Sequence, residues 1–231
     1  NMSANNTTVP GKLRYGNTSF NTSDSNQIYT RGTIGVKSGK YYWEAKQGDG
    51  SQWVIGIMVE AMLTQTNNQF WDTTSVTGVA VNGSSNTLYI NGGAGDSFNT
   101  GISVNSNTIY GFALDVDNRA FYVHVNGTYI TANSAVGDPT SGSSRTGSVL
   151  GELTTRGGTG GLNYIPVDEY IYPLMADVAT SGNSQLKMNF GNGYFDTTAI
   201  SSEGTNAAGH GKFEYNVPTG YTALCTKGLN E

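Results

Sequence analysis

Residues 38–46 (SGKYYWEAK) constrain what this chain can fold into more than any other stretch. The residues at 41, 43 and 45, with Trp43 in the middle, alternate with those at 42, 44 and 46, of which Glu44 and Lys46 carry charge. Because side chains alternate between the two faces of a β-strand, this period of two places bulky apolar groups on one face and charge on the other. The stretch is predicted to be a strand that is buried on one face only.

Residues 53–58 (WVIGIM) form a second run, which is apolar on both faces. Gly56 in its middle is typical of a central strand whose backbone is approached closely by a neighbour. The polar residues 48–51 (GDGS) between the two runs supply a turn.

The composition favours one large all-β domain with many turns. Of 231 residues, 36% are hydrophobic and only 13% are charged, so Asn, Ser, Thr and Gly must keep the surface soluble. The 32 glycines favour turns over helices, and 14 Tyr, eight Phe and three Trp are too many for a disordered chain. Asn1 and Met2 resemble the remnant of a cleaved expression tag. Residues 3–231 are expected to form a single domain, either a whole protein or a fragment of a larger one.

Charge, hydropathy and cysteine content exclude several classes of protein. A net charge of −5 with 12 scattered Lys and Arg residues provides no basic patch for nucleic acid. No apolar run approaches the roughly 20 residues of a membrane-spanning helix, and no signal peptide is recognisable. The single cysteine, Cys225, excludes an intramolecular disulfide and a cysteine-rich metal site, and is expected to be a small hydrophobic residue in a final strand.

The rest of the chain shows further strands separated by turns. They are expected at residues 28–36, 79–81, 88–90, 109–116, 120–125, 129–130, 170–176 and 186–190, after an extended arm or edge strands in residues 3–27. In the fourth of these strands the large residues share one face, and the small Gly111 and Ala113 opposite leave room for another layer. Asn126 and Gly127 tolerate the positive φ that a tight hairpin turn needs.

Nine apolar residues in separate predicted strands are expected to form the core of an antiparallel β-sandwich. They are Trp43, Ile55, Ile57, Phe112, Leu114, Phe121, Val123, Leu174 and Phe190. The sandwich is expected over residues 28–195, with residues 212–226 as a closing C-terminal strand.

Three blocks of sequence together resemble the SPRY (B30.2-like) domain. They are residues 38–44 (SGKYYWE), residues 109–115 (IYGFALD) with 121–127 (FYVHVNG), and residues 172–174 (YPL) with 189–191 (NFG). Their order and spacing both agree with the family. The resemblance implies a bent antiparallel sandwich of the concanavalin-like jelly-roll type. It also implies a module that binds other proteins through loops at one end of the sandwich and is not an enzyme.

Residues 213–226 (FEYNVPTGYTALCT) resemble the tail that follows SPRY domains in proteins of marine bacteriophages. In those relatives a Gly-Asp-Pro loop follows the Asn-Gly turn, as residues 137–139 do here. The chain departs from their pattern by extra residues at 142–169 and 196–210, whose role the resemblance does not supply. We therefore expect a non-catalytic binding or structural module of a bacteriophage virion, in a tail fibre or another surface-exposed protein.

The groups that could carry chemistry are few and isolated. Asp115 and Asp117, at a strand end, could be the paired carboxylates of a sandwich glycosidase. Alternatively, Asp117 forms the turn before Asn118 and Asp115 caps the strand. His124 and His210 are isolated, which gives no support to a metal pair or to a nucleophile with its base. We predict no catalytic residue, no metal ligand and no cofactor.

Two long segments, residues 60–75 and 131–169, are the expected recognition loops, because binding residues concentrate on loops held by a rigid scaffold. Within the second, residues 131–163 are expected to be too polar to fill a core. Aromatic residues and Arg dominate binding hot spots. The predicted binding residues are Phe70, Trp71, Arg156 and Tyr164. Phe70 and Trp71 could equally staple their loop to the sandwich.

The expected partner is a protein or a host-surface glycan, on the host surface or on a neighbouring virion subunit. A second copy of the chain within the virion is a further candidate partner. The expected location is the phage particle, after synthesis in the cytoplasm of the bacterial host. Two alternatives stay open: an intracellular SPRY-type adaptor that captures a peptide, and a carbohydrate-binding or glycan-degrading sandwich protein.

Overall fold

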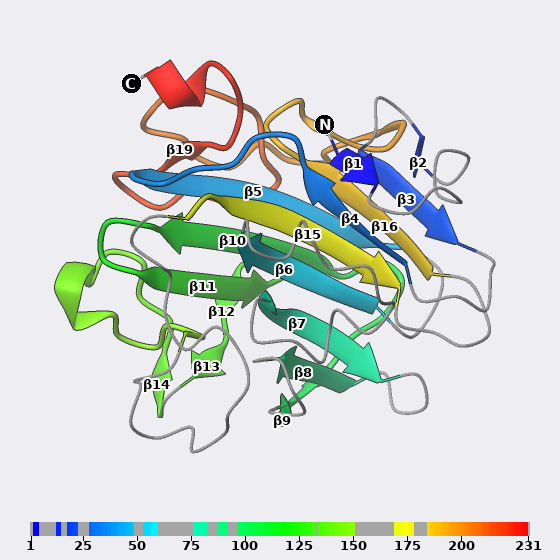
Figure 1. Cartoon of the computed structure of the whole chain (residues 1–231), viewed down its shortest axis with the longest axis horizontal. Coiled ribbons are helices and arrows are strands. Elements are labelled where there is room, and N and C mark those ends of the chain that lie inside the picture. The colour runs from blue at the N-terminus through cyan, green and yellow to red at the C-terminus, as the bar shows by residue number, and fades with distance from the viewer. Residues whose placement is uncertain are drawn as a thin grey trace.

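The computed structural model describes residues 2–4, 13–14, 18–22, 28–48, 53–59, 76–82, 87–91, 97–132, 134–150, 169–177 and 184–230. These residues form strands and two short 3₁₀-helices, η3 (Gly142–Ser144) and η4 (Gly228–Asn230), without an α-helix. Two sheets with antiparallel neighbours pack against each other as a curved sandwich (Figure 1). The predicted all-β antiparallel sandwich is confirmed.

The first sheet has seven strands in the order β1-β4-β15-β6-β7-β8-β9. Their bounds are β1 Met2–Ala4, β4 Ile28–Gly32, β15 Ile171–Asp177, β6 Trp53–Val59, β7 Val76–Asn82, β8 Thr87–Asn91 and β9 Ser97–Ser103. β6 lies between β15 and β7 and is buried along its whole length, as predicted for a central strand.

The second sheet has eight strands, seven of them in the order β12-β11-β10-β5-β16-β3-β2. Their bounds are β12 Thr128–Tyr129, β11 Ala120–Val125, β10 Ile109–Asp115, β5 Lys40–Gln47, β16 Ser184–Asn189, β3 Ser19–Thr22 and β2 Leu13–Arg14. The eighth strand, β19 (Thr222–Ala223), pairs with β5. Two small pairs are separate: β13 (Thr131–Ala132) with β14 (Ala135–Val136), and β17 (Tyr194–Phe195) with β18 (Thr198–Ala199).

The core lies between the two sheets and contains most of the residues that the alternation predicts. Seven of the nine predicted core residues belong to it, Phe190 is partly buried and packs against it, and Leu174 is buried but lies outside this cluster. Trp43, which is fully buried, stacks on Phe112 at 5.5 Å and on Phe121 at 6.0 Å between ring centroids. Three neighbouring strands, β5, β10 and β11, thus each contribute one ring to an aromatic stack in the core.

The prediction that residues 131–163 are too polar to fill a core is wrong for the described part of that segment. Val149 and Leu150 are buried in the sandwich core. Val149 N donates to Phe121 O at 2.8 Å, and Ser148 Oγ accepts from Phe121 N at 3.1 Å. Because the segment satisfies the backbone of β11 in this way, a polar stretch can bring two apolar side chains into the core.

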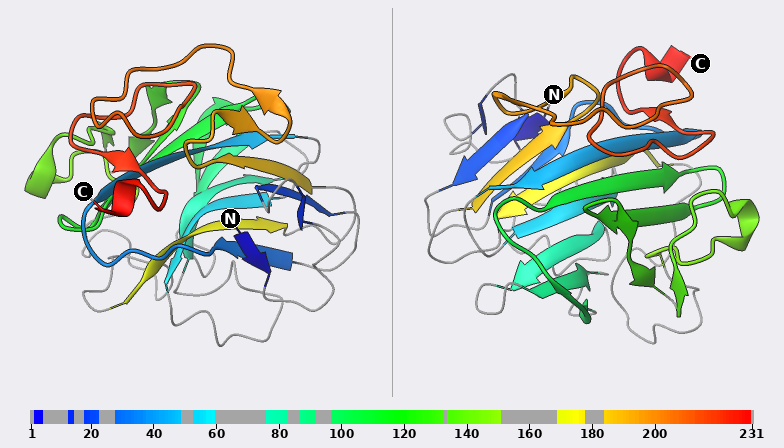
Figure 2. Two further views of the ribbon diagram at one scale, coloured as in Figure 1. Left: turned by 90° about the horizontal axis from the view of Figure 1, so that it is seen from above. Right: turned by 180° about the vertical axis from the view of Figure 1, so that it is seen from behind.

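Part of the outer face of the eight-stranded sheet is also buried, which corrects the prediction that β5 is buried on one face only. Tyr42 and Glu44, on that face, are both 0% exposed. The C-terminal tail (residues 212–226) covers them (Figure 2). A second apolar cluster joins tail and sheet: Tyr42, Ala113, Ala120, Tyr122, Phe213, Val217, Tyr221 and Ala223. The prediction that the small residues of β10 leave room for another layer is confirmed.

The predicted closing strand at 212–226 is wrong for most of its length. Within the tail only β19 is a strand, and it pairs in parallel with Tyr41 and Tyr42. β16 pairs with residues 44–47 on the same edge of β5. Residues 41 and 42 on that edge are therefore left for the tail. A turn with Gly220 at a φ of 84° precedes β19 and prevents a longer strand. Cys225 lies two residues beyond β19 and packs, partly buried, against the second cluster.

Candidate functional site

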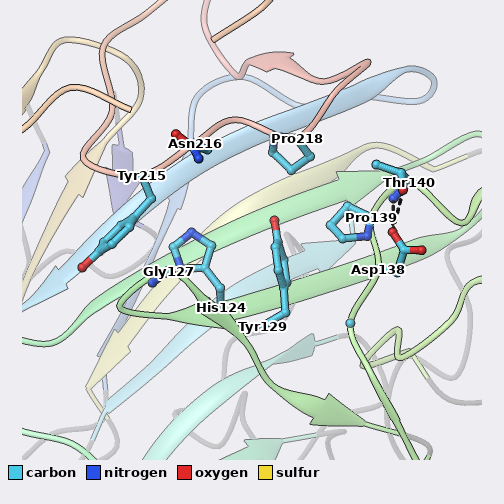
Figure 3. A pocket seen from close by; sticks show the side chains of 10 residues that line it. His124, Gly127, Tyr129, Asp138, Pro139, Thr140, Tyr215, Asn216 and Pro218 are labelled. Carbon is cyan, nitrogen blue, oxygen red and sulfur yellow. Dashed lines mark hydrogen bonds between the residues drawn. The ribbon is translucent and has the colours of Figure 1, made fainter. Parts of the chain in front are cut away.

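A pocket of about 420 Å³ lies on the outer face of the eight-stranded sheet, where the tail meets β12 (Figure 3). Four parts of the chain line it: the end of β11 with its turn at Gly127, β12, residues 137–140, and residues 215–218 of the tail. The Asn-Gly turn, the Gly-Asp-Pro loop and the tail, which the sequence singles out separately, therefore meet at one place.

Three aromatic rings form the pocket's framework, with Tyr129 and Tyr215 on either side of His124 (Figure 3). The imidazole centroid lies 5.4 Å from that of Tyr129 at an interplanar angle of 83°, and 5.1 Å from that of Tyr215 at 73°. Both tyrosine rings thus stand steeply to the imidazole, in the edge-to-face geometry that aromatic pairs prefer. The three rings make an aromatic box.

His124 reaches the pocket through the alternation of β11 and a glycine on the neighbouring strand. Val123 and Val125 face the core, so His124 faces the tail. Its cross-strand partner is Gly111 of β10, where a Cβ atom would lie only 1.8 Å from His124 Nε2. Glycine at this position leaves the space that the imidazole fills.

The hydrogen bonds of His124 fix its tautomer. Asn126 and Gly127 have φ values of 48° and 85°, which confirms the predicted tight turn, and Gly127 N donates to His124 Nδ1 at 3.1 Å. Nε2 therefore carries the proton of the neutral ring and donates to the Tyr42 hydroxyl oxygen at 2.7 Å. Burial lowers the pKa of His124 to about 3, so the ring is neutral at physiological pH.

Glu44 ends this chain of hydrogen bonds and holds the tail. Its Oε1 atom accepts from the Tyr42 hydroxyl at 3.1 Å and from Tyr215 N at 2.8 Å. Its Oε2 atom accepts from Glu214 N at 2.9 Å and from Asn189 Nδ2 at 3.3 Å. Burial raises the pKa of Glu44 to about 7, while these four donors act to lower it. A buried carboxylate thus anchors the backbone of a pocket residue to the sheet.

Asp138 and Tyr129 each carry a polar atom that has no partner in the described part of the chain. Asp138 Oδ1 accepts from Thr140 N at 2.9 Å and from Thr140 Oγ1 at 2.6 Å, whereas Oδ2 accepts no hydrogen bond there (Figure 3). The buried Tyr129 hydroxyl also lacks a partner among the described residues. Tyr221 Oη donates to Pro139 O at 3.1 Å and ties this loop to the tail.

The two aspartates considered as a glycosidase pair have structural roles. Asp115 is buried, forms an ion pair with Lys40 at 2.8 Å and accepts from Asn118 N at 2.9 Å and Asn118 Nδ2 at 2.8 Å. Asp117 Oδ1 accepts from Gly39 N at 2.8 Å. The interpretation as a strand-end cap and a turn residue is therefore confirmed.

The four binding residues predicted from the sequence lie outside the described residues: Phe70, Trp71, Arg156 and Tyr164. The same holds for residues 60–75 and 151–168, so those predictions stay untested. Of the second predicted loop, the described residues 137–140 do line the pocket.

Sequence reasoning missed His124, Glu44 and Tyr215. A histidine placed opposite Gly111 was the available signal for the first of these. The described residues bring no three His, Cys, Asp or Glu side chains together to hold a metal ion. No helix among them is long and apolar enough to cross a membrane.

Comparison with known structures identifies the fold. No family model and no curated protein matches the chain. Among solved structures, the PSpry domain of TRIM65 matches with a TM-score of 0.50 and 11% sequence identity, over 81% of this chain and 91% of that domain. The chain has the SPRY fold. The SPRY domain of human HERC1 matches with a TM-score of 0.45 and 15% identity, over 78% of this chain and 94% of that domain.

Proposed function

We propose that this SPRY-fold chain is a non-catalytic recognition module of a bacteriophage virion, and that it binds a protein partner through the pocket between β12 and the tail. The observation that carries the proposal is the way in which the pocket is held. The chain of hydrogen bonds from Gly127 through His124 and Tyr42 to Glu44 ends on the backbone of Tyr215. Such buried support fixes the side chains of a binding site before the ligand arrives.

The chemistry of the pocket supports binding rather than catalysis. Both ring nitrogens of His124 are occupied, so the imidazole is in no position to take a proton from a substrate. Asp138 is the single carboxylate among the lining residues, whereas glycosidase chemistry needs two that face each other. Buried Asp115 is occupied by the turn at Asn118, and exposed Asp117 accepts from the backbone of Gly39.

The polar atoms of the pocket favour a protein partner over a glycan. Thr140 Oγ1 is bonded to Asp138, Asn216 Oδ1 accepts from Thr205 N, and Gly127 N is bonded to His124. A glycan presents many hydroxyl groups, and these three groups are not free to bond them. Protein binding is also what the SPRY resemblance implies.

Two motifs that resemble those of marine bacteriophage proteins support a virion role. The Gly-Asp-Pro loop at 137–139 and the tail residues 215–218 are two walls of the same pocket. Their connection through Tyr221 and Pro139 makes them a single structural unit. An intracellular peptide-binding adaptor is the alternative, and the genes that surround this one in its genome would separate the two.

The test is a binding assay with virion and host-envelope fractions, each divided into protein and polysaccharide. Wild type is compared with Tyr215→Ala, which removes a wall of the pocket but keeps the backbone donor to Glu44. Asp117→Asn, on the turn at the other end of β11, is the matched control. The proposal expects a protease-sensitive partner that Tyr215→Ala loses at least tenfold and Asp117→Asn retains. Equal binding by folded Tyr215→Ala would move the site elsewhere, and binding only to polysaccharide would replace the protein partner by a glycan.

A further inference from the structure

The acidic side chain of the pocket suits a cation. Asp138 is exposed, its Oδ2 accepts no hydrogen bond, and it forms no ion pair within the described part of the chain. No Lys or Arg is among the residues that line the pocket. The hydroxyl of Tyr129 has no partner among the described residues, but it is buried, so Tyr129 offers its ring and not its hydroxyl to a ligand.

Carboxylates act on both tyrosine walls of the pocket. Burial raises the pKa of Tyr129, and the charge of Asp138 raises it further. Burial also raises the pKa of Tyr215, and the nearby Glu214 and Glu44 raise it further. His124 between them is buried and neutral, so the floor does not repel a positive charge.

Two cations on the segments that build the pocket, Arg145 and Lys212, leave this negative character in place. Arg145 is close enough to influence the same tyrosine as Asp138: burial raises the pKa of Tyr122 most, Asp138 raises it and Arg145 lowers it. Arg145 and Asp138 nevertheless form no ion pair in the part of the chain that the structure describes. Lys212, in the tail, is paired with Glu203 at 3.2 Å.

From this geometry we infer that the pocket binds an arginine side chain of the partner protein, an inference that rests on the proposed function. The guanidinium lies against the rings of Tyr129 and Tyr215 and donates to Asp138 Oδ2. A planar guanidinium stacks on aromatic rings and donates in its own plane, which a lysine ammonium does not do. The pocket's volume is at the lower end of ligand sites, of a size for one or two side chains.

The main competitor is an uncharged side chain, such as a proline, because tyrosine and proline rings also line the pocket. A neutral ligand would bury the aromatic walls without using the charge of Asp138. Charge is therefore the property that the experiment must vary while shape is held constant.

The experiment is an NMR titration of the ¹⁵N-labelled protein with three capped amino acids: N-acetyl-arginine methylamide, its citrulline counterpart and its proline counterpart. Citrulline has nearly the shape of arginine without the charge. The amide signals of Gly127, Thr140 and Asn216 report on the pocket. We expect arginine to bind at least about tenfold more tightly than citrulline or proline, as befits one charge-assisted contact.

Two isosteric variants complete the test. Asp138→Asn keeps the Oδ1 acceptor for Thr140 and removes the charge, and should weaken arginine binding about tenfold while leaving citrulline unchanged. Asp117→Asn changes an aspartate in the same way at the far end of β11, and it should alter the binding of neither arginine nor citrulline. Equal affinities for arginine and citrulline, tighter binding of proline, an equal effect of the two variants, or no arginine-induced shifts up to its solubility limit would each overturn the inference. Loss of the partner protein in Tyr215→Ala would still uphold the proposed function in that case.

Discussion

Glu44 and Tyr215 lie 171 residues apart in the chain, and Glu44 Oε1 accepts a hydrogen bond from Tyr215 N at 2.8 Å. Through this contact a residue in the middle of the sheet fixes the backbone of a residue in the pocket wall. Glu214 N donates to the other carboxylate oxygen at 2.9 Å, so two consecutive amides of the tail depend on one side chain. The tail has little regular structure of its own, and this carboxylate replaces the ladder that a strand would provide.

Replacing Glu44 by glutamine should loosen the tail. The amide nitrogen of the new side chain would face a donor, either Glu214 N or Tyr215 N, where the carboxylate now presents an acceptor. Above pH 7, where Glu44 is ionised, Glu44→Gln should lower the free energy of unfolding by about 1 to 3 kcal/mol, since a buried donor is left unpaired. Chemical denaturation measures the loss, and hydrogen exchange should be faster at the amides of residues 214 and 215. Unchanged exchange at both would contradict the anchoring role of Glu44.

Stability should depend little on pH between about 4.5 and 6.5, because two buried groups act in opposite directions. The pKa of Glu44 is raised from 4.5 to about 7, so its contribution to stability is complete below 4.5 and is lost as pH rises through 7. The pKa of His124 is lowered from 6.5 to about 3, so its contribution is complete above 6.5 and is lost as pH falls through 3.

Glu44→Gln should expose the His124 contribution alone. In this variant the free energy of unfolding should rise from pH 3 to 6.5 with a slope of up to about 1.4 kcal/mol per pH unit. Urea denaturation at a series of pH values compares the variant with wild type. Parallel curves for the two proteins would show that the opposing titrations are absent.

Sequence reasoning predicted the sandwich core because alternation in β5, β10 and β11 is set by burial of one face between the sheets. It did not predict that the face of β5 bearing Glu44 is buried, because this face looks solvent-exposed when its cover is unknown. That cover is a tail without sheet periodicity, whose contacts to β5 are long-range. Only the small residues of β10, Gly111 and Ala113, revealed from within a strand that something else packs there.

Short strands and the pairing of distant strands were also not predicted from the sequence. β9 was not predicted, since Phe98 and Ile102 are its only large apolar residues and Thr100 and Gly101 between them weaken the alternation. Met2, which the sequence assigns to a tag remnant, pairs with Gly32 at the edge of the first sheet. The aromatic box was missed because it combines residues from β11, β12 and the tail. The periodicity of each segment carries no information on which distant segments contact one another.

Trp43→Ala tests the sandwich core itself. Trp43 is fully buried and stacks on two phenylalanines, so the substitution should cost about 3 to 5 kcal/mol through lost burial and the cavity left behind. The fall in denaturation midpoint at an unchanged m-value measures it. A cost below about 1 kcal/mol would be incompatible with a tightly packed core at this site.

Gly127→Ala tests whether the turn and the pocket wall depend on each other. Gly127 has a φ of 85°, and a Cβ atom there would lie 2.8 Å from Tyr215 Cδ1, against a ring that packs on His124. The variant should combine backbone strain of about 1 to 2 kcal/mol with displacement of the Tyr215 ring. Gly220→Ala is the matched control, because Gly220 has a φ of 84° and a Cβ atom added there would meet no other atom within 4 Å.

Both variants should lose similar stability from backbone strain, and only Gly127→Ala should also change the environment of Tyr215. Aromatic ¹³C chemical shifts of Tyr215 and His124 measure that change, and arginine binding should weaken with it. If Tyr215 kept its shifts in a folded Gly127→Ala protein, the ring would have room to spare, and the turn would not shape the pocket. An equal disturbance of Tyr215 in both variants would instead show that the tail moves as a whole, with Gly220 as sensitive a position as Gly127.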